Sequence, residues 1–220
     1  MLVERVYDFL SYGEPPLKAE CIFVLAGKQE RKTYGIELWK AAWAPELILS
    51  VGRFEWRRFY TLGFPRDGGL KELVDSTPPT ERHFFVCFVT DDARAVRTKK
   101  GKYGTISEAD ALTVLLKGRR VRSVLVVSTS IHLRRVALAF RNTFKGSGVR
   151  LSFVPVPEDF SSIRRQDLAS SPEMRREVWQ EFRKFLGYRL VFACGSLWMR
   201  INQTGGRDHT QRRSEEKNGS

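Results

Sequence analysis

The chain has 220 residues and a formal net charge of +13, from 38 Lys and Arg against 25 Asp and Glu. Hydrophobic residues make up 42% and charged residues 29%, which is typical of a folded globular protein and excludes a wholly disordered, collagen-like or multi-span membrane chain. The basic charge favours an anionic partner: nucleic acid, an anionic membrane surface or a phosphorylated small molecule. The length predicts one domain, taken as residues 1–201, with two small domains as the alternative.

Cysteine placement and the N-terminus indicate a cytoplasmic protein. Cys21, Cys87 and Cys194 stand alone, without a Cys-x-x-Cys pair or a histidine at metal-ligand spacing. We therefore expect free thiols in a reducing compartment and no metal site. Residues 1–10 contain no basic start followed by an apolar run, so no signal peptide is predicted.

Apolar runs alternate with helical patterns along the chain. Buried strands are predicted at residues 21–26, 47–51, 83–90, 123–128 and 149–156. Helices are predicted at residues 31–43, 106–116, 133–144 and 172–189, the last with Ser171 as N-cap and Pro172 in the first turn. Because strands and helices alternate, we expect a doubly wound, mostly parallel sheet of about five strands with helices on both faces.

Three segments depart from this alternation. Residues 63–82 contain several prolines and glycines and predict a long connection with one short helix near 70–74. Residues 190–199 are apolar but shorter than the roughly 20 residues of a membrane span. They predict a final hydrophobic helix or strand, with a weak membrane-surface contact as the alternative. The polar tail over residues 202–220 is expected to be disordered.

The loops that follow the strands are the expected ligand site, because open parallel sheets bind ligands at the carboxyl ends of their strands. Basic residues occur in all five of these loops, at 27–32, 52–58, 91–103, 129–135 and 157–165. They predict an anion pocket formed by helix N-termini and arginines. The alternative is that exposed loops simply carry charge. Asp91 and Asp92, after the third strand, either serve a ligand or metal or pair with the basic residues beside them.

Two glycines directly follow predicted strands. Gly27 follows the first strand and Gly52 the second, where each is either turn chemistry or a place for backbone to approach a ligand. Neither lies in a Gly-x-Gly-x-x-Gly sequence, and no phosphate loop ending in Gly-Lys-Ser/Thr is present. The dinucleotide fingerprint is therefore absent.

The junction after the fourth strand combines hydroxyl, imidazole and guanidinium groups. We expect Thr129 and Ser130 to supply oxygen contacts, and Arg135, together with Arg53, to contact an anion. His132 is a candidate general acid or base, the alternative being a residue that packs the first helical turn.

A second polar pair precedes this junction in the chain. Thr105 and Glu108 have the spacing of a capping box, which is one interpretation. The other is that Glu108 performs acid–base chemistry together with His132.

Taken together, these motifs resemble the YdcF/SanA/ElyC-like family, a bacterial family of domains of unknown function, over about residues 21–188. The matching positions are Gly27 in the first glycine loop, Ser50 and Gly52 in the Ser-Gly-Gly loop, Thr105 and Glu108 in the Thr/Glu motif, and Thr129, His132 and Arg135 in the Thr/Ser-x-x-His-x-x-Arg motif. This chain departs from the family in having fewer glycines in both loops and Arg134 where proline is common.

The resemblance implies a Rossmann-like fold and an enzymatic activity, with S-adenosylmethionine or a nucleotide as ligand and a link to cell-envelope metabolism. The first predicted function is thus an enzyme or ligand-binding protein for a phosphorylated or nucleotide-like anionic small molecule. The alternative is a basic module that binds nucleic acid or an anionic surface without catalysis. Phe54, Trp56 and Phe59, among arginines, are the residues that could stack on bases.

Overall fold

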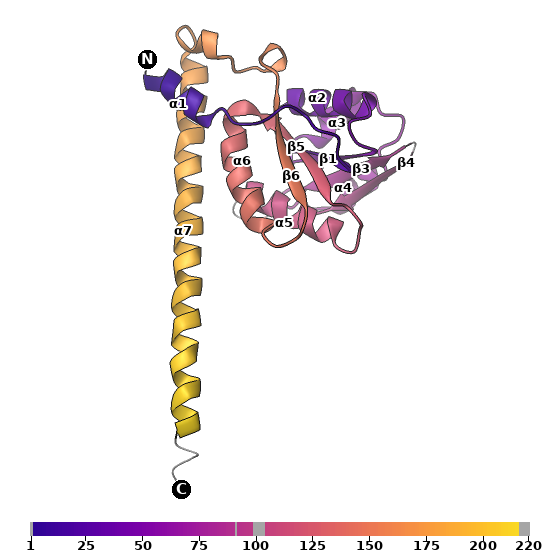
Figure 1. The fold of residues 1–220 in the computed structure, drawn as a ribbon. Helices are drawn as coiled ribbons and strands as arrows, with labels where there is room; N and C mark the ends of the chain where they lie inside the picture. The colour runs from indigo at the N-terminus through magenta and orange to yellow at the C-terminus, as the bar shows by residue number, and fades with distance from the viewer. Residues whose placement is uncertain (1, 91, 99–103, 216–220) are drawn as a thin grey trace.

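The computed structural model describes residues 2–90, 92–98 and 104–215, with side chains described as far as Cys194. It is an α/β structure around a six-stranded sheet with the strand order β4-β3-β2-β1-β5-β6 (Figure 1). The strands are β1 (Cys21–Val24), β2 (Glu46–Val51), β3 (Phe84–Val89), β4 (Asp92–Arg97), β5 (Ser123–Thr129) and β6 (Arg150–Val156). All five predicted strands are present, and β4 is an addition that the apolar pattern did not reveal.

The strands β2, β1, β5 and β6 are parallel to one another, whereas β3 and β4 form antiparallel pairs at the other end of the sheet. β1 pairs in parallel with β2 and β5, and β5 pairs in parallel with β6. β3 runs antiparallel to both β2 and β4. The link between β3 and β4 is too short for a crossover helix, so the chain returns as a hairpin with Thr90 at a φ of 54°.

This hairpin corrects the predicted placement of the loop over residues 91–103. Asp92 pairs with Val89, and Glu46 at the start of β2 pairs with the same Val89. Asp92 therefore lies at the opposite edge of the sheet from the carboxyl ends of β1, β2 and β5. It is not brought to the expected ligand edge, and Asp91 is outside the described residues.

Helices cover both faces of the sheet. On one face, α2 (Gln29–Lys40) and α4 (Leu70–Ser76) pack on alternate side chains of β1, β2 and β3. On the other face, α5 (Gly104–Leu116) and α6 (Ser130–Thr143) pack around Phe23 and Phe153. The short helix α4 confirms the prediction near residues 70–74, and α3 (Trp56–Phe59) follows β2.

Two further helices pack together beside α6. These are α1 (Leu2–Leu10), which the sequence did not predict, and α7 (Pro172–Glu215). The Ser171 hydroxyl accepts a hydrogen bond of 3.2 Å from the Met174 amide, as expected for an N-cap. Figure 1 shows α7 continuing beyond the sheet as one long helix, so it overlaps the segment expected to be disordered, residues 202–220. Disorder there stays a prediction.

Within the part of the chain that the structure describes, no helix combines the length and apolar character needed to cross a membrane.

Candidate functional site

Glu108 lies at the edge of the sheet where the parallel strands β1 and β2 have their carboxyl ends. It projects from α5, and its Oε1 accepts hydrogen bonds from the Ala26 amide at 2.9 Å and the Ser50 hydroxyl at 2.6 Å. These partners follow β1 and end β2, so Glu108 bridges the two strands. Burial raises the pKa of this carboxyl, and the hydrogen bonds from Ser50 and Ala26 oppose that rise. Thr105 lies inside α5 rather than at its N-cap, so the two residues do not form a capping box.

A chain of polar groups continues from Glu108 into the sheet. The Ser50 hydroxyl lies 3.2 Å from His83 Nε2, and His83 Nδ1 lies 2.6 Å from the Thr98 hydroxyl. His83 was not among the predicted site residues. It precedes β3, and only the antiparallel direction of β3 brings it beside the carboxyl end of β2.

Arg31 links the first glycine loop to the end of β5. Its guanidinium donates to the Ala26 carbonyl at 2.6 Å and to the Thr129 hydroxyl at 3.0 Å. Arg31 is buried, and burial lowers its pKa. Gly27 adopts a φ of +130°, and a Cβ at that position would lie 2.7 Å from Arg31 Nη1. Glycine is needed here so that the buried guanidinium can approach the backbone.

The Glu55 carboxylate lies between the two glycine loops, next to Gly27 and Gly52. Its Oε1 accepts a hydrogen bond of 2.7 Å from the Gly27 amide, and its Oε2 pairs with the buried Lys32 ammonium. A Cβ at Gly52 would lie 2.8 Å from the same Oε1. The amides of Ala26 and Gly27 therefore bind the protein's own carboxylates, those of Glu108 and Glu55.

A fully buried carboxylate, Glu181 of α7, holds the polar residues of α6. Arg135 donates to it from Nε at 2.5 Å and from Nη2 at 3.3 Å, while Arg135 Nη1 donates to the Thr105 hydroxyl. His132 Nδ1 lies 2.6 Å from Glu181 Oε2. Glu181 was not predicted, because the sequence around it reads as a charged helix surface.

The pKa values of this cluster fix its protonation near neutral pH. Burial alone would raise the pKa of Glu181, but the hydrogen bond from His132 and the charges of His132 and Arg135 lower it to about 2. Burial, with the positive charge of Arg31, lowers the pKa of His132 to about 4. His132 is therefore a neutral imidazole beside the Glu181 carboxylate.

A pocket of about 500 Å³ opens between α5, α6 and α7, in front of these groups. Of the predicted site residues, Thr105, Glu108 and Arg135 line it. Lys184 and Tyr188 of α7 complete its polar wall, and the Lys184 side chain is 57% exposed. The remaining lining residues are Gly104, Gly187 and Val191.

The other predicted residues take different places. Gly27, Ser50, Gly52, Thr129 and His132 belong to the network behind the pocket.

Two predicted residues are not brought to the pocket. The Ser130 backbone carbonyl accepts a bond from the Tyr12 amide, and its side chain bonds Tyr7 on α1. Arg53 stacks on the Phe54 ring at 4.6 Å.

Comparisons of the chain with protein-family models, with curated proteins and with solved structures found no match.

Proposed function

We propose that the chain is an enzyme or ligand-binding protein that takes an anionic, phosphorylated or nucleotide-like small molecule in the pocket between α5, α6 and α7. The observation that carries this proposal is Glu108, a buried carboxyl that lines an open pocket among cationic side chains. Membership of the YdcF/SanA/ElyC-like family, with its Rossmann-like fold, is part of the same proposal, and S-adenosylmethionine belongs among the ligands to test.

Glu108 is the group best suited to proton transfer. Two donors hold its Oε1, and no hydrogen bond to Oε2 occurs among the residues that the structure describes. A carboxyl whose pKa is raised by burial, next to a pocket, can carry and deliver a proton closer to neutral pH. The Ser50 hydroxyl bonds this carboxyl and contacts the His83 imidazole, so the three groups form a path along which the proton can be exchanged.

The charges around the pocket favour an anion. Arg31, Arg135 and Lys184 are cations, and the carboxyls that balance them are Glu181 and Glu108. These three cations against two carboxyls leave the group with a net positive charge, and protonation of Glu108 increases it. Three of the five N–H groups of Arg135 already bind Glu181 and Thr105, so we assign the direct anion contact to the exposed Lys184 and the positioning of Thr105 to Arg135.

A thermal-shift series with inorganic phosphate, nucleotides, sugar phosphates and S-adenosylmethionine tests this proposal. A ligand at a hundred times its Kd stabilises the native state by about 2.7 kcal/mol, or on the order of 5–10 °C in Tm for a chain of this size. Lys184→Ala should reduce the shift, whereas Lys117→Ala, exposed at the far end of α5, should not. Equal shifts in the two variants, or no shift with any anion, would refute the proposal.

A second candidate, nucleic-acid binding, is favoured by one exposed aromatic group. Phe54 is 75% exposed with the Arg53 guanidinium over its ring, and Arg57 stacks on Trp56 at 5.1 Å. Such rings beside cations can stack on single-stranded bases. Fluorescence anisotropy with a labelled oligonucleotide should show weaker binding for Phe54→Ala, and binding that is unchanged in this variant would exclude the site.

A further inference from the structure

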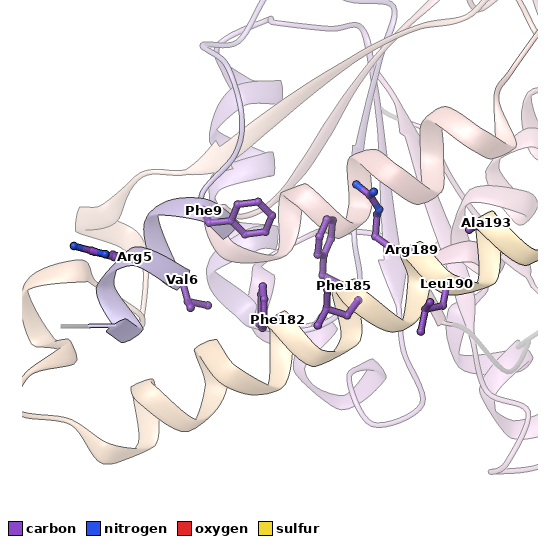
Figure 2. A pocket seen from close by; sticks show the side chains of 9 residues that line it. Arg5, Val6, Phe9, Phe182, Phe185, Arg189, Leu190 and Ala193 are labelled. Carbon is purple, nitrogen blue, oxygen red and sulfur yellow. The ribbon is translucent and has the colours of Figure 1, made fainter.

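An apolar groove of about 770 Å³ runs between α1 and α7, away from the pocket described above. Figure 2 shows Phe9 of α1 next to Phe182 and Phe185 of α7, with Arg5 and Arg189 on the two sides. The groove is lined by Arg5, Val6, Phe9, Phe182, Phe185, Leu186, Arg189, Leu190 and Ala193.

An apolar strip runs along the exposed side of α7, next to this groove and partly within it. Trp179, Leu186 and Leu190 are 37%, 45% and 66% exposed, and their spacing of seven and four residues places them on one side of the helix. On the helix surface, the exposed Arg183 flanks one side of the strip and the exposed Arg189 the other. An exposed helix face with tryptophan and leucine between arginines is typical of helices that lie in a membrane interface.

The charges and the continuing sequence select one occupant for the groove. A second copy would bring Arg5 and Arg189 of one chain towards the same basic residues of another, in a protein whose net charge is already +13. Residues 190–199 contain no charged residue in the sequence, so the stretch continues the apolar character of Leu186 and Leu190.

A lipid bilayer can cover the exposed side of this helix, where Leu186 and Leu190 lie. At 1.5 Å per residue, residues 190–199 extend about 15 Å, which is half of a hydrocarbon core of about 30 Å. The segment is thus suited to the interface and does not reach across it. Arginines at the border can extend their guanidinium groups to lipid phosphates while their methylenes remain in apolar surroundings.

We propose that α1 and α7 dock the protein on the surface of an anionic bilayer, with the strip of Trp179, Leu186 and Leu190 in the interface and Arg5, Arg183 and Arg189 on lipid headgroups. The groove that Phe9, Phe182 and Leu190 line accepts the ends of acyl chains. This inference does not depend on the pocket or on its ligand.

Co-sedimentation of the full chain with vesicles tests the proposal. Vesicles of phosphatidylcholine with about 30% phosphatidylglycerol should bind the protein, and pure phosphatidylcholine should bind it much less. Raising the salt concentration should weaken binding, because surface charges are screened within a Debye length. Equal binding to both kinds of vesicle, or binding to neither, would overturn the proposal.

Variants locate the docking surface. Leu190→Glu and Leu186→Glu should each lower the partition coefficient at least tenfold, and Arg189→Ala should lower it about fivefold, since each basic residue contributes about 1 kcal/mol. The matched control is Val114→Glu on α5, because Val114 is 73% exposed and lies outside the groove. Leu190→Glu that still binds like Val114→Glu would refute this surface. A dimer that Leu190→Glu disrupts, without vesicle binding, would assign the groove to a second copy instead.

Discussion

Replacing His132 with asparagine should remove a specific part of the protein's acid sensitivity. The imidazole is 12% exposed, and burial lowers its pKa from 6.5 to about 4. The unfolded chain therefore takes up a proton at His132 more readily than the folded chain does. The free energy of unfolding falls as the pH is lowered from 6.5 towards 4, and above 6.5 the stabilising effect is fully present.

The size of this effect follows from the two pKa values. Near pH 5, His132 is mostly protonated in the unfolded chain and mostly neutral in the folded chain. Proton linkage then removes about 2 kcal/mol of stability between pH 7 and pH 5. Urea unfolding followed by tryptophan fluorescence measures the free energy of unfolding at both pH values. The wild type should lose about 2 kcal/mol more than His132→Asn does.

Asparagine is the informative substitution because its amide is a hydrogen-bond donor that does not titrate. Background titration of carboxyl groups affects both proteins alike and cancels in the comparison. His209→Asn, in the segment expected to be disordered, controls for the loss of any histidine and should behave like the wild type. Equal losses in the wild type and His132→Asn would show that the imidazole is not held neutral, and the reasoning about the Glu181 cluster would be refuted.

Three further perturbations test other parts of the structure. Arg135→Ala should cost about 3–5 kcal/mol in urea unfolding, because it leaves Glu181 buried without its main counter-charge, and a loss below about 1 kcal/mol would contradict this. Gly35→Ala should cost about 1–3 kcal/mol in the same assay, because its Cβ would lie 2.3 Å from Val24 Cγ2, and a neutral result would show that α2 can shift away from β1. Truncation before Thr204 should change Tm by little in a thermal melt, whereas a loss of several degrees would show that the removed segment packs.

The sheet was largely predictable because its strands are apolar over their whole length. Short apolar runs such as residues 123–128 are typical of central strands between two layers of helices. Strand direction was not predictable in the same way. The run before Thr90 reads identically as a parallel or an antiparallel strand, and β4 alternates between charged and small residues without an apolar signature.

The candidate site was predictable where its residues follow strands and not where helices supply the partner. Ser50 and Thr129 lie at strand ends, and Glu108 lies near the start of a helix. The rule that open parallel sheets bind ligands at the carboxyl ends of their strands therefore predicts them as site residues. Glu181 lies among charged residues on a long helix, and the sequence does not distinguish it from an exposed glutamate. Only the packing of α7 on α6 shows that this carboxylate is buried.

Helix α7 has two faces with different chemistry, and both proposals depend on this division. Its inner face contributes Glu181, which is fully buried, and Tyr188, which lines the pocket. Its outer face carries Leu186 and Leu190, which are exposed. Docking of the outer face would hold the helix without using any group that the pocket needs. A ligand site and a membrane contact can therefore coexist on one helix, and a substitution on the outer face can test docking while the pocket stays intact.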